Sequence, residues 1–568
     1  MNSSPRYIKL AVLTGISLFA VLTFSFKNDL FQVSKNLDIF ASVYKELNIN
    51  YVDDVNSSGL IKTGIDAMLN QLDPYTEFVP ESEIEDYKMK YVSTQYGGIG
   101  AGVIHRDGKV FISDPFEGYP AQLADIRAGD EIISINGNAL KGKNNEEVSL
   151  LLKGPKETPL AIKILRDGKV LEKNLKRADI KQPNVSYHGM LENQVAYIKL
   201  DKFLENSAQE VKDALADLKK NNPTGLIIDL RFNGGGILQE AVKIVNLFVG
   251  KDVEVVSQKG RNPEKTINYR TFLSATEPDL PLIILINGRS ASASEIVAGS
   301  LQDLDRAIVI GQRSFGKGLV QQTFNLPYNT LVKVTVAKYY TPSGRCIQSL
   351  DYTHRLEDGS VEKVSDSLIT EYKTKGGRSV YDGSGIYPDI NLTPFKYHEI
   401  TQTLVSKYHV FDFATEFRKN NPSIISSPAE FKLSESDYLS FVSFLSGKDF
   451  KYQTPTESLL ESLKEEAADD KKFAEILPEI DALKNKMARS KTNDLVAFKP
   501  EIKRLLESEI VQRYYFEKGR IQQSFQYDEE LKKALEMFKN KQQYTAVLTG
   551  EGAFKTIGKP GKVSASAN

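Results

Sequence analysis

Three uninterrupted apolar runs constrain the fold of this chain most strongly: TGLIIDL, PLIILING and AIVIG, all between residues 224 and 311. Runs rich in Ile, Val and Leu, without polar alternation, are typical of strands buried on both faces of a parallel sheet. Between them lie a predicted amphipathic helix, ILQEAVKIVNLFV, and a second predicted helix, SASASEIVAGSLQDL. The sequence therefore predicts an alternating α/β core between about residues 194 and 390.

The regions on either side of this core have different patterns. Apolar residues recur at helical spacing from residue 30 to about 91, and short strands and turns follow from about 97 to 170. In that second region Asp107-Gly108 and Asp167-Gly168 are hairpin turn signals, and NEEVSLLL predicts a short helix between them. After Pro394 the chain is helical and heavily charged, and its last residues, KTIGKPGKVSASAN, predict a disordered tail.

Length and composition exclude several classes of protein. A chain of 568 residues predicts about three or four domains. With 73 basic and 74 acidic side chains, it lacks the basic excess of a nucleic-acid-binding protein, so no nucleic-acid partner is expected. The single cysteine, Cys346, excludes a cysteine-rich zinc site, and the five widely spaced histidines lack the usual metal-ligand spacing. A Ser-His-Asp hydrolase stays open on composition alone.

The N-terminal segment bears on localisation. Residues Leu10 to Phe26 carry no charge, and Arg6 and Lys9 precede them. The segment is longer than a usual signal-peptide core and slightly shorter than an ideal membrane span. A retained single-pass anchor is favoured, with a cleaved signal peptide and a buried core helix as alternatives. The first two export the rest of the chain because the basic flank stays inside, and an exported protein without disulfides fits the near-absence of cysteine.

The segment SASASE, residues 290–295, has two interpretations. Ser292 with Glu295 three residues later forms a capping box, which only begins a helix. Alternatively, Ser292 is a nucleophile on a strand-to-helix turn, where amide groups at the helix N-terminus hold a developing oxyanion. A serine hydroxyl needs a base to take its proton. No histidine lies nearby in sequence, so the base must come from elsewhere.

The segment GQRSFGKG, residues 311–318, matches the spacing of a phosphate-binding loop. Gly318 stands where that loop needs Ser or Thr, and the residues that follow alternate like strands rather than forming a helix, which argues against an NTPase. The remaining interpretations are a glycine-rich turn with a surface lysine, or a lysine crowded out of water between glycines. Desolvation would lower the pKa of such an amine from about 10.4 toward neutrality, so that it could serve as a general base.

Two further glycine-rich segments could bind ligands. RFNGGG, residues 231–236, follows the strand LIIDL at the sheet edge where α/β proteins bind ligands. YGGIGA, residues 96–101, could form a backbone nest for a peptide carboxylate, with the peptide adding as a strand to the sheet edge. Taken alone, RFNGGG is better explained as an ordinary βα turn, and the glycines of YGGIGA could also form a bulge or a turn.

The order of these segments is more specific than any one of them. The chain resembles the carboxyl-terminal processing (tail-specific) serine proteases of bacterial envelopes and plastid lumens. The resemblance covers about residues 35 to 392. It rests on LNQLDPYTEF, YGGIGAGV, PAQLADIRAGDEIISING, IIDLRFNGGG, INGRSASASEIVAGSLQD, RSFGKGLVQ, YYTPSGRCIQ and GIYPDI, in the family's order.

The resemblance implies a catalytic set. It places the nucleophile at Ser292, the general base at Lys317 and a supporting glutamine at Gln321, four residues after the lysine. Residues four apart on a strand share a face, so Gln321 could orient the lysine amine. The implied oxyanion donors are the amide groups of Ala293 and of Gly236 or Gly235.

The resemblance also implies how substrates bind. It places the carboxylate-binding loop of a PDZ domain at Gly98, Ile99 and Gly100, and a pocket for the side chains of the substrate tail at Val148, Leu151 and Leu152. The expected partners are protein substrates with nonpolar C-termini.

The implied fold class is α/β within an α+β multidomain chain: a crotonase-like protease core with an inserted PDZ domain, an N-terminal helical segment and a C-terminal helical extension. The expected parts are residues 1–28 (signal or anchor), 29–90 (helical), 91–176 (PDZ), 177–395 (protease core) and 396–568 (helical extension with a disordered tail). Two departures from the family pattern concern single sites. LLKGPKETPLAIKI lacks a glycine usual after the Gly-Pro turn, and Cys346 replaces a common serine, so a catalytic cysteine is not expected.

The predicted function is that of an exported serine endopeptidase of the C-terminal processing type, acting through a Ser/Lys acyl-enzyme mechanism. The mechanism that the resemblance implies needs no metal and no cofactor. It is expected in the bacterial periplasm or cell envelope, anchored to the inner membrane by its N-terminal segment. The alternative is a scaffold with an inactive protease fold that presents client tails to a partner, but a scaffold has no use for the serine, lysine and glutamine together. The C-terminal helices could form a homodimer, cover the active site or dock an adaptor, although a merely solvated charged face is the favoured expectation.

Overall fold

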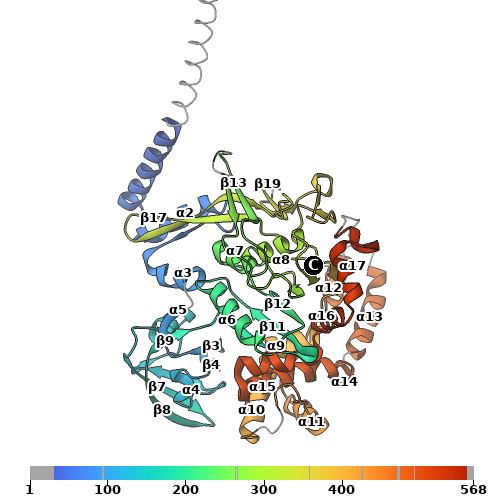
Figure 1. Cartoon of the computed structure of the whole chain (residues 1–568). Helices are drawn as coiled ribbons and strands as arrows, with labels where there is room; N and C mark the ends of the chain where they lie inside the picture. The colour runs from blue at the N-terminus through green and yellow to red at the C-terminus, as the bar shows by residue number, and fades with distance from the viewer. Residues whose placement is uncertain are drawn as a thin grey trace, which may run out of the picture. The chain divides into compact units, whose positions relative to one another are not determined.

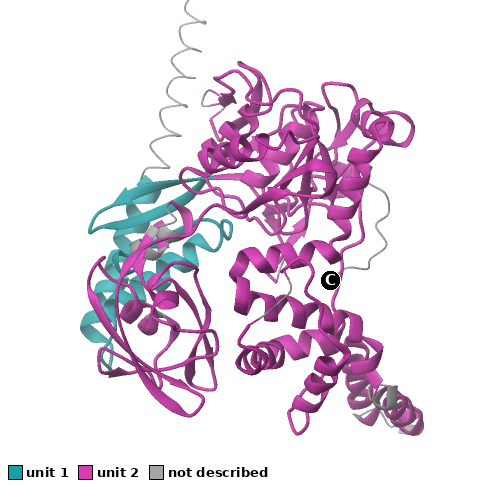
Figure 2. Ribbon diagram, turned by 60° about the horizontal axis from the view of Figure 1, so that its bottom comes forward, with its two compact units in different colours: residues 1–84, 321–335 teal, residues 85–320, 336–568 magenta. Residues whose placement is uncertain are grey.

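The computed structural model describes residues 31–558 except 93–94, 263, 265, 357, 424–426, 470–473 and 491–492. The chain divides into two compact units (Figure 2): residues 1–84 with 321–335, and residues 85–320 with 336–568. The apolar segment at 10–26, predicted as an anchor or signal, lies outside the described residues. Among the helices that are described, none combines the length and apolarity needed to cross a membrane.

The larger unit contains a six-stranded sheet that carries the candidate site. Two of its strands, β11 and β12, are labelled in Figure 1. Its strands run in the order β10 (Val185–Met190), β11 (Val195–Leu200), β12 (Gly225–Asp229), β15 (Leu282–Ile286), β16 (Ile308–Gly311) and β23 (Ile390–Asn391). Every neighbouring pair is parallel except β10 with β11. The three apolar runs of the sequence are β12, β15 and β16, and every residue of these strands is buried, which confirms the predicted parallel core.

One face of this sheet is covered by helices that connect its strands. These are α6 (Ser207–Lys219), α7 (Leu238–Asn246) and α8 (Ala293–Asp303). Alternate strand residues, such as Ile228 and Ile284, pack against apolar residues of all three helices. Helix α8 is buried along its whole length, so its N-terminus is held rigidly at the end of β15.

The other face of the sheet is covered by the C-terminal helices α16 (Glu529–Lys539) and α17 (Lys541–Thr549). Ile227 and Ile283, on the opposite side of the strands from Ile228 and Ile284, pack in one cluster with Leu531 of α16. Met537 and Val547 belong to the same cluster. Strands before residue 395 and helices after it therefore share one apolar core.

The expectation of a disordered tail is wrong for its first residues. Ile557 is 4% exposed, and its amide donates to the carbonyl oxygen of Ser379 at 2.9 Å. A side chain buried in this way stabilises the fold by about 1.5–3 kcal/mol, which holds this stretch against the core. Residues 559–568 lie outside the described residues.

The region predicted as a PDZ domain forms its own sheet and core in the larger unit. The strand order is β3 (Ala101–Arg106), β4 (Lys109–Pro115), β5 (Glu131–Ile135), β7 (Pro159–Arg166) and β8 (Lys169–Lys176), with β6 (Asn138–Ala139) beside β5. Strand β2 (Gln95–Gly98) pairs with β9 (Ala178–Lys181), and the helices are α4 (Pro120–Leu123) and α5 (Asn145–Leu152). Asp107 and Asp167 have positive φ in the hairpins β3–β4 and β7–β8, as their turn signals predict.

The charged C-terminal region is helical, as predicted. Helices α9 (Glu399–Ser406), α10 (His409–Asn420), α11 (Glu435–Phe444) and α15 (Lys499–Ser524) enclose an aromatic-rich core. Helices α12 (Pro455–Asp469) and α13 (Leu477–Ser490) share a smaller one, and α14 (Asp494–Ala497) is a single turn before α15.

The PDZ region contacts helix α10 through the half-buried cation of Arg106. The guanidinium of Arg106 donates to both carboxylate oxygens of Asp412, at 2.9 and 3.0 Å. It also lies over the rings of Phe111 and Tyr408, at 4.9 and 5.3 Å from their centroids.

The smaller unit consists of two pieces of chain that are distant in sequence. Helix α2 (Ser57–Leu69) and strand β1 (Glu77–Val79) come from the first piece. The second supplies most of β17 (Leu319–Leu326) and the first part of β18 (Thr330–Tyr340), which pair with each other. Strand β1 is antiparallel to β18, with Phe78 opposite Val332.

The remaining elements of the larger unit are short. They are α3 (Ile84–Tyr91, which begins at the last residue of the smaller unit) and the antiparallel pairs β13 (Glu254–Gly260) with β14 (Ile267–Arg270), β19 (Leu350–Arg355) with β20 (Val361–Lys363), and β21 (Glu371–Lys373) with β22 (Ser379–Tyr381).

Candidate active site

Ser292 lies at a strained turn between β15 and α8. Its backbone angles are φ 56° and ψ −114°, outside the ordinary range for a residue with a side chain, and helix α8 begins at the next residue. Such strain costs about 1–3 kcal/mol and persists only where the surrounding structure enforces it. The turn places the serine at the N-terminal end of a buried helix, where amide groups and the helix dipole favour negative charge.

Glu295 connects this turn to the segment that contains Lys317. One carboxylate oxygen of Glu295 accepts from the amide groups of Ser292 (2.7 Å) and Lys317 (2.9 Å). The other accepts from the Ser314 hydroxyl (2.5 Å) and the Gly316 amide (2.7 Å). A single buried carboxylate therefore holds the backbone of both predicted catalytic residues.

The capping-box interpretation is confirmed only for its glutamate half. The Glu295 side chain binds the Ser292 amide, as a capping box requires, but the Glu295 amide donates to the carbonyl oxygen of Ser292 at 2.8 Å. The Ser292 side chain makes no capping hydrogen bond. Burial raises the pKa of Glu295 above its ordinary value, and the four donors around the carboxylate act against that rise.

The glycine-rich loop after β12 is hydrogen-bonded to the serine turn. The Asn233 carbonyl oxygen accepts from the Ala291 amide (3.0 Å) and the Ser294 hydroxyl (2.9 Å). A Cβ atom on Gly235 would lie 2.7 Å from the Ser292 Cβ and 2.8 Å from the Ala293 nitrogen, so only glycine allows this approach. The loop and the helix N-terminus thus lie in direct contact.

The amide groups of this loop differ in their availability. The Gly235 amide donates to the Asn233 side chain at 2.9 Å. Within the described part of the chain, the structure gives the Gly236 and Ala293 amides no hydrogen-bond acceptor. Of the two glycines predicted as oxyanion donors, Gly236 is therefore the one whose amide is open to a substrate.

The segment around Lys317 packs tightly against neighbouring backbone. A Cβ atom on Gly316 would lie 2.4 Å from the Ser349 hydroxyl, and one on Gly318 would lie 2.8 Å from the Gln348 nitrogen. The Gly318 amide donates to the Gln348 side chain at 2.8 Å. Lys317 itself is half-buried. The fold therefore fixes the lysine backbone on both sides, and strands β17 and β18 follow it, as the argument against an NTPase requires.

Gln321 belongs to the smaller unit, on β17. Its amide nitrogen donates to the Thr335 hydroxyl of β18 at 3.1 Å, and Thr335 in turn donates to the carboxylate of Asp73 at 3.1 Å. The predictions from sequence missed Thr335 and Asp73. Asp73 lies inside the quoted motif LNQLDPYTEF, which was the only signal available for it.

The predicted carboxylate loop of the PDZ region leaves two amide groups open. The carbonyl oxygens of Ile99 and Gly100 accept from other backbone amides at 2.9 and 2.8 Å. The structure, over the residues it describes, gives the amides of these two residues no acceptor. Strand β3 follows directly and lies at the edge of its sheet, where a further strand can add. Gly98 belongs to β2 and pairs with Ala178.

The three predicted pocket residues lie on α5 but differ in exposure. Val148 is fully buried and Leu152 is 6% exposed, both within the core of the PDZ region. Leu151 is half-buried against that core. Of these three side chains, Leu151 is the one most accessible to a ligand, while Leu150 beside it is 75% exposed.

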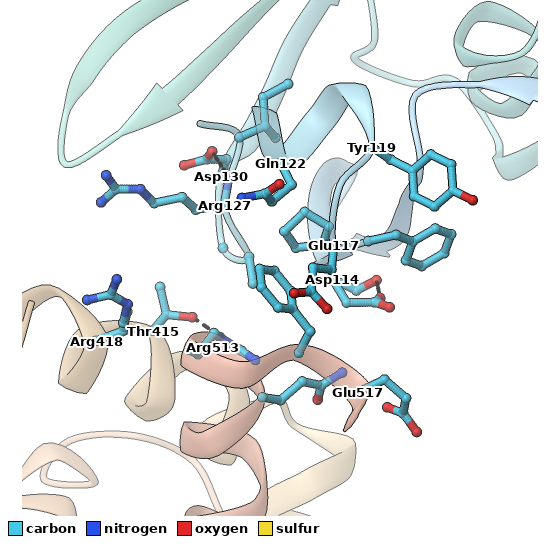
Figure 3. A pocket seen from close by; sticks show the side chains of 18 of the residues that line it. Asp114, Glu117, Tyr119, Gln122, Arg127, Asp130, Thr415, Arg418, Arg513 and Glu517 are labelled. Atoms are coloured by element: carbon cyan, nitrogen blue, oxygen red, sulfur yellow. Dashed lines mark hydrogen bonds between the residues drawn. The ribbon is translucent and has the colours of Figure 1, made fainter. Parts of the chain in front are cut away.

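A cleft of about 1290 Å³ lies between loops of the PDZ region and helices α10 and α15 (Figure 3). Its lining contains neither Ser292 nor Lys317. Charged side chains of both signs line it, Asp114, Glu117 and Asp130 from the PDZ region and Arg418, Arg513 and Glu517 from the helices. The cleft is therefore separate from the candidate catalytic groups.

Two further features concern the Cys346 thiol and the arrangement of side chains that could bind a metal. Burial raises the pKa of the Cys346 thiol, which disfavours the reactive thiolate. Within the described residues, no group of three or more His, Cys, Asp or Glu side chains is arranged to hold a metal ion.

A known relative decides the family. A carboxy-terminal-processing protease of Bartonella bacilliformis (strain ATCC 35685 / KC583 / Herrer 020/F12,63) is 35% identical over 325 residues, which are 56% of this chain and 74% of the relative. The chain belongs to the carboxy-terminal-processing protease family.

Further matches cover the other parts of this processing protease. The model of peptidase family S41 matches residues 194–356, that of the PDZ domain matches 91–165, and that described as "Probable PDZ-protease, C-terminal helical domain" matches 400–538. A probable CtpA-like serine protease of Staphylococcus aureus (strain MRSA252) is 35% identical over 314 residues, 55% of this chain and 62% of that one. A solved photosystem II D1 C-terminal processing protease shares 25% identity, covering 62% of this chain and 92% of its own, with a TM-score of 0.33.

These findings confirm the resemblance and the fold class. The processing protease is a mixed α/β protein with an S41 protease core, a PDZ domain and a C-terminal helical domain. It is a C-terminal processing serine protease. The roles of individual residues, and the domain boundaries drawn from the sequence, stay predictions.

Proposed function

We propose that this processing protease hydrolyses peptide bonds through an acyl-enzyme on Ser292, with the amine of Lys317 as general base. The observation that carries the proposal is the Glu295 carboxylate, which binds the backbone amides of both residues. A structural carboxylate needs no such pair of partners, whereas a serine–lysine dyad needs its two loops held at a fixed separation, because a displacement of about 1 Å can cost about 10²-fold in rate.

Each step of the proposed reaction uses groups of this chain. The Lys317 amine takes the hydroxyl proton as the Ser292 oxygen attacks the peptide carbonyl, and the C–O bond forms. The open amides of Ala293 and Gly236 support a role in holding the oxyanion. The lysine then gives its proton to the leaving amine as the C–N bond breaks. A water molecule, deprotonated by the same amine, hydrolyses the ester and restores the serine.

Gln321 completes the proposed catalytic set. It lies four residues after Lys317, on the strand that the lysine segment enters. We propose that its side-chain oxygen accepts a hydrogen bond from the lysine amine and so orients it. An acceptor at this position also stabilises the ammonium ion that forms during the attack.

The test compares four purified variants on an unfolded substrate protein. Ser292→Ala and Lys317→Ala should abolish cleavage, whereas the exposed controls Ser360→Ala and Lys251→Ala should retain it. Mass spectrometry of the products identifies the cleaved bonds. Cleavage that persists in Ser292→Ala, or no cleavage by the wild-type protein, contradicts the proposal and would favour the scaffold alternative.

We propose further that the PDZ domain binds nonpolar C-terminal tails. The open amides of Ile99 and Gly100 support a carboxylate site, and the edge strand β3 supports addition of the tail as a strand. A fluorescent peptide with a nonpolar, free C-terminus should bind more tightly than the same peptide with an amidated or charged terminus. Equal affinity for the three peptides would refute this specificity.

Export to the cell envelope is the last part of the proposal. It rests on the uncharged segment from Leu10 to Phe26 and the basic residues before it. In a bacterial host, proteinase added to spheroplasts should digest the full-length chain but not a variant that lacks residues 1–28. Membrane sedimentation separates a retained anchor from a cleaved signal, and protection of the full-length chain would contradict export.

A further inference from the structure

A partly buried chain of hydrogen bonds in the smaller unit ends at Gln321. Asp73 is 6% exposed and follows helix α2 in a turn. One of its carboxylate oxygens accepts from the amides of Tyr75 (2.8 Å) and Thr76 (3.0 Å), and also from the Thr335 hydroxyl (3.1 Å). The oxygen of the Thr335 hydroxyl accepts a hydrogen bond from the side-chain NH₂ group of Gln321 at 3.1 Å.

Thr76 also holds Asp73 and Thr335 in place relative to each other. Its hydroxyl donates to the other carboxylate oxygen of Asp73 at 3.0 Å and accepts from the Thr335 amide at 3.1 Å. Thr76 is 5% exposed. The turn that contains Asp73 is therefore bound to both the backbone and the side chain of Thr335.

The chemistry of the donors decides which way each hydrogen bond in this series runs. An ionised carboxylate only accepts hydrogen bonds, so the single hydroxyl proton of Thr335 is committed to Asp73. The Thr335 oxygen can then only accept from Gln321, which requires the NH₂ end of the glutamine amide to face Thr335. The carbonyl oxygen of Gln321 is left at the other end of the amide, away from the chain.

We propose that Asp73 and Thr335 are positioning residues of the catalytic site, which set the orientation of the Gln321 amide so that its carbonyl oxygen faces the Lys317 amine. This inference rests on the proposed function. If the amide turned over, its NH₂ group would face the amine, and a donor there disfavours the ammonium ion that forms when Ser292 is deprotonated.

The test replaces the Thr335 hydroxyl by a methyl group of nearly the same size. Thr335→Val should lower kcat about tenfold, with KM changed less than twofold, because one hydrogen bond of about 1.4 kcal/mol is lost. Thr335→Ser keeps the hydroxyl and should retain the wild-type kcat. Asp73→Ala removes the acceptor that commits the hydroxyl and should lower kcat as Thr335→Val does, provided that its thermal unfolding matches that of the wild type.

Two further readouts separate positioning from simple loss of stability. The acid limb of the kcat profile should move to lower pH by about half a unit to one unit in Thr335→Val, because an amine without its acceptor holds a proton less firmly. In a Gln321→Ala background, Thr335→Val should have no further effect on kcat, since the hydrogen bonds from Asp73 and Thr335 then have no glutamine amide to orient.

The outcomes distinguish the two proposals. A Thr335→Val variant with wild-type kcat and pH profile, or one whose effect is fully retained in the Gln321→Ala background, overturns this inference while Ser292 and Lys317 stay essential. If Ser292→Ala and Lys317→Ala retain activity, the proposed function has failed and this inference fails with it.

Discussion

The substitution Glu295→Gln tests the centre of the candidate site with the smallest change of shape. The carboxylate accepts four hydrogen bonds, two on each oxygen. A glutamine amide has one oxygen and one NH₂ group, so two of the four donors must face a donor. The Ser314 hydroxyl can reverse and accept from the new NH₂ group, whereas the Gly316 amide cannot.

The cost of this change follows from the bonds that are altered. The Gly316 amide loses its acceptor, which costs about 1–3 kcal/mol for a buried donor. The bonds from the Ser292 and Lys317 amides lose their charged acceptor, at about 1 kcal/mol each. We expect about 3–5 kcal/mol in total, divided between lower stability and displacement of the two loops, and we expect kcat to fall about 100-fold.

The assay measures acylation and thermal unfolding in parallel. Single-turnover reaction with a chromogenic ester reports the reactivity of Ser292, and differential scanning calorimetry reports the unfolding temperature. The control is Glu192→Gln, at an exposed position outside the site, which should leave both unchanged. A Glu295→Gln protein with kcat within about threefold of the wild type and the same unfolding temperature would refute the role assigned to this carboxylate.

Three other predictions follow from contacts of the larger unit. Arg106→Ala removes the cation held by Asp412 and two rings, so limited proteolysis should cut the β3–β4 hairpin faster, and an unchanged rate would speak against this contact. Removal of residues 528–568 exposes one face of the core sheet, which costs about 1.5–3 kcal/mol of stability for each large apolar side chain. The truncated protein should therefore aggregate on expression, and a soluble truncated protein that unfolds like the wild type would contradict this. Burial opposes the charge of Asp229, but Arg231 holds the pKa of this carboxyl well below its usual range. The stabilisation from this pair is therefore complete at pH values above the ordinary aspartate pKa, and it is lost only as the pH falls below that pKa. Asp229→Asn should lower the free energy of unfolding by about 3–5 kcal/mol, and by the same amount at every pH from 5 to 8. A loss of stability that changes between pH 5 and pH 8 would refute the pairing.

The N-terminal and central parts of the fold could be predicted from sequence because their signals are local. A strand such as β12 is apolar at every position, and a turn such as Asp107-Gly108 has its own conformational preference, so neither depends on distant partners. The order of short glycine-rich and serine-rich motifs then identified the family. That order also nominated Ser292, Lys317 and Gln321, whose catalytic roles await the experiments above.

The C-terminal helices could not be placed in the same way. The apolar stripe of α16 indicates only that this helix covers something, since a stripe carries no information about its partner. The structure shows that the partner is the second face of the protease sheet, because Leu531 of α16 and Ile227 of β12 belong to one apolar cluster. The same reasoning explains why Ile557 was wrongly assigned to a disordered tail: its neighbours in sequence are polar, and its partners are distant in the chain.

The sequence by itself determined the class of fold, the family and the residue types of the candidate site, because hydrophobic periodicity and motif order are written along the chain. Only the tertiary structure decided how these residues are held. The Glu295 carboxylate meets Ser314, Gly316 and Lys317, and Asp73 meets Thr335, across 19 to 262 residues of sequence. A hydrogen bond forms only between groups within about 3 Å of each other, and closeness of this kind is a property of the folded chain.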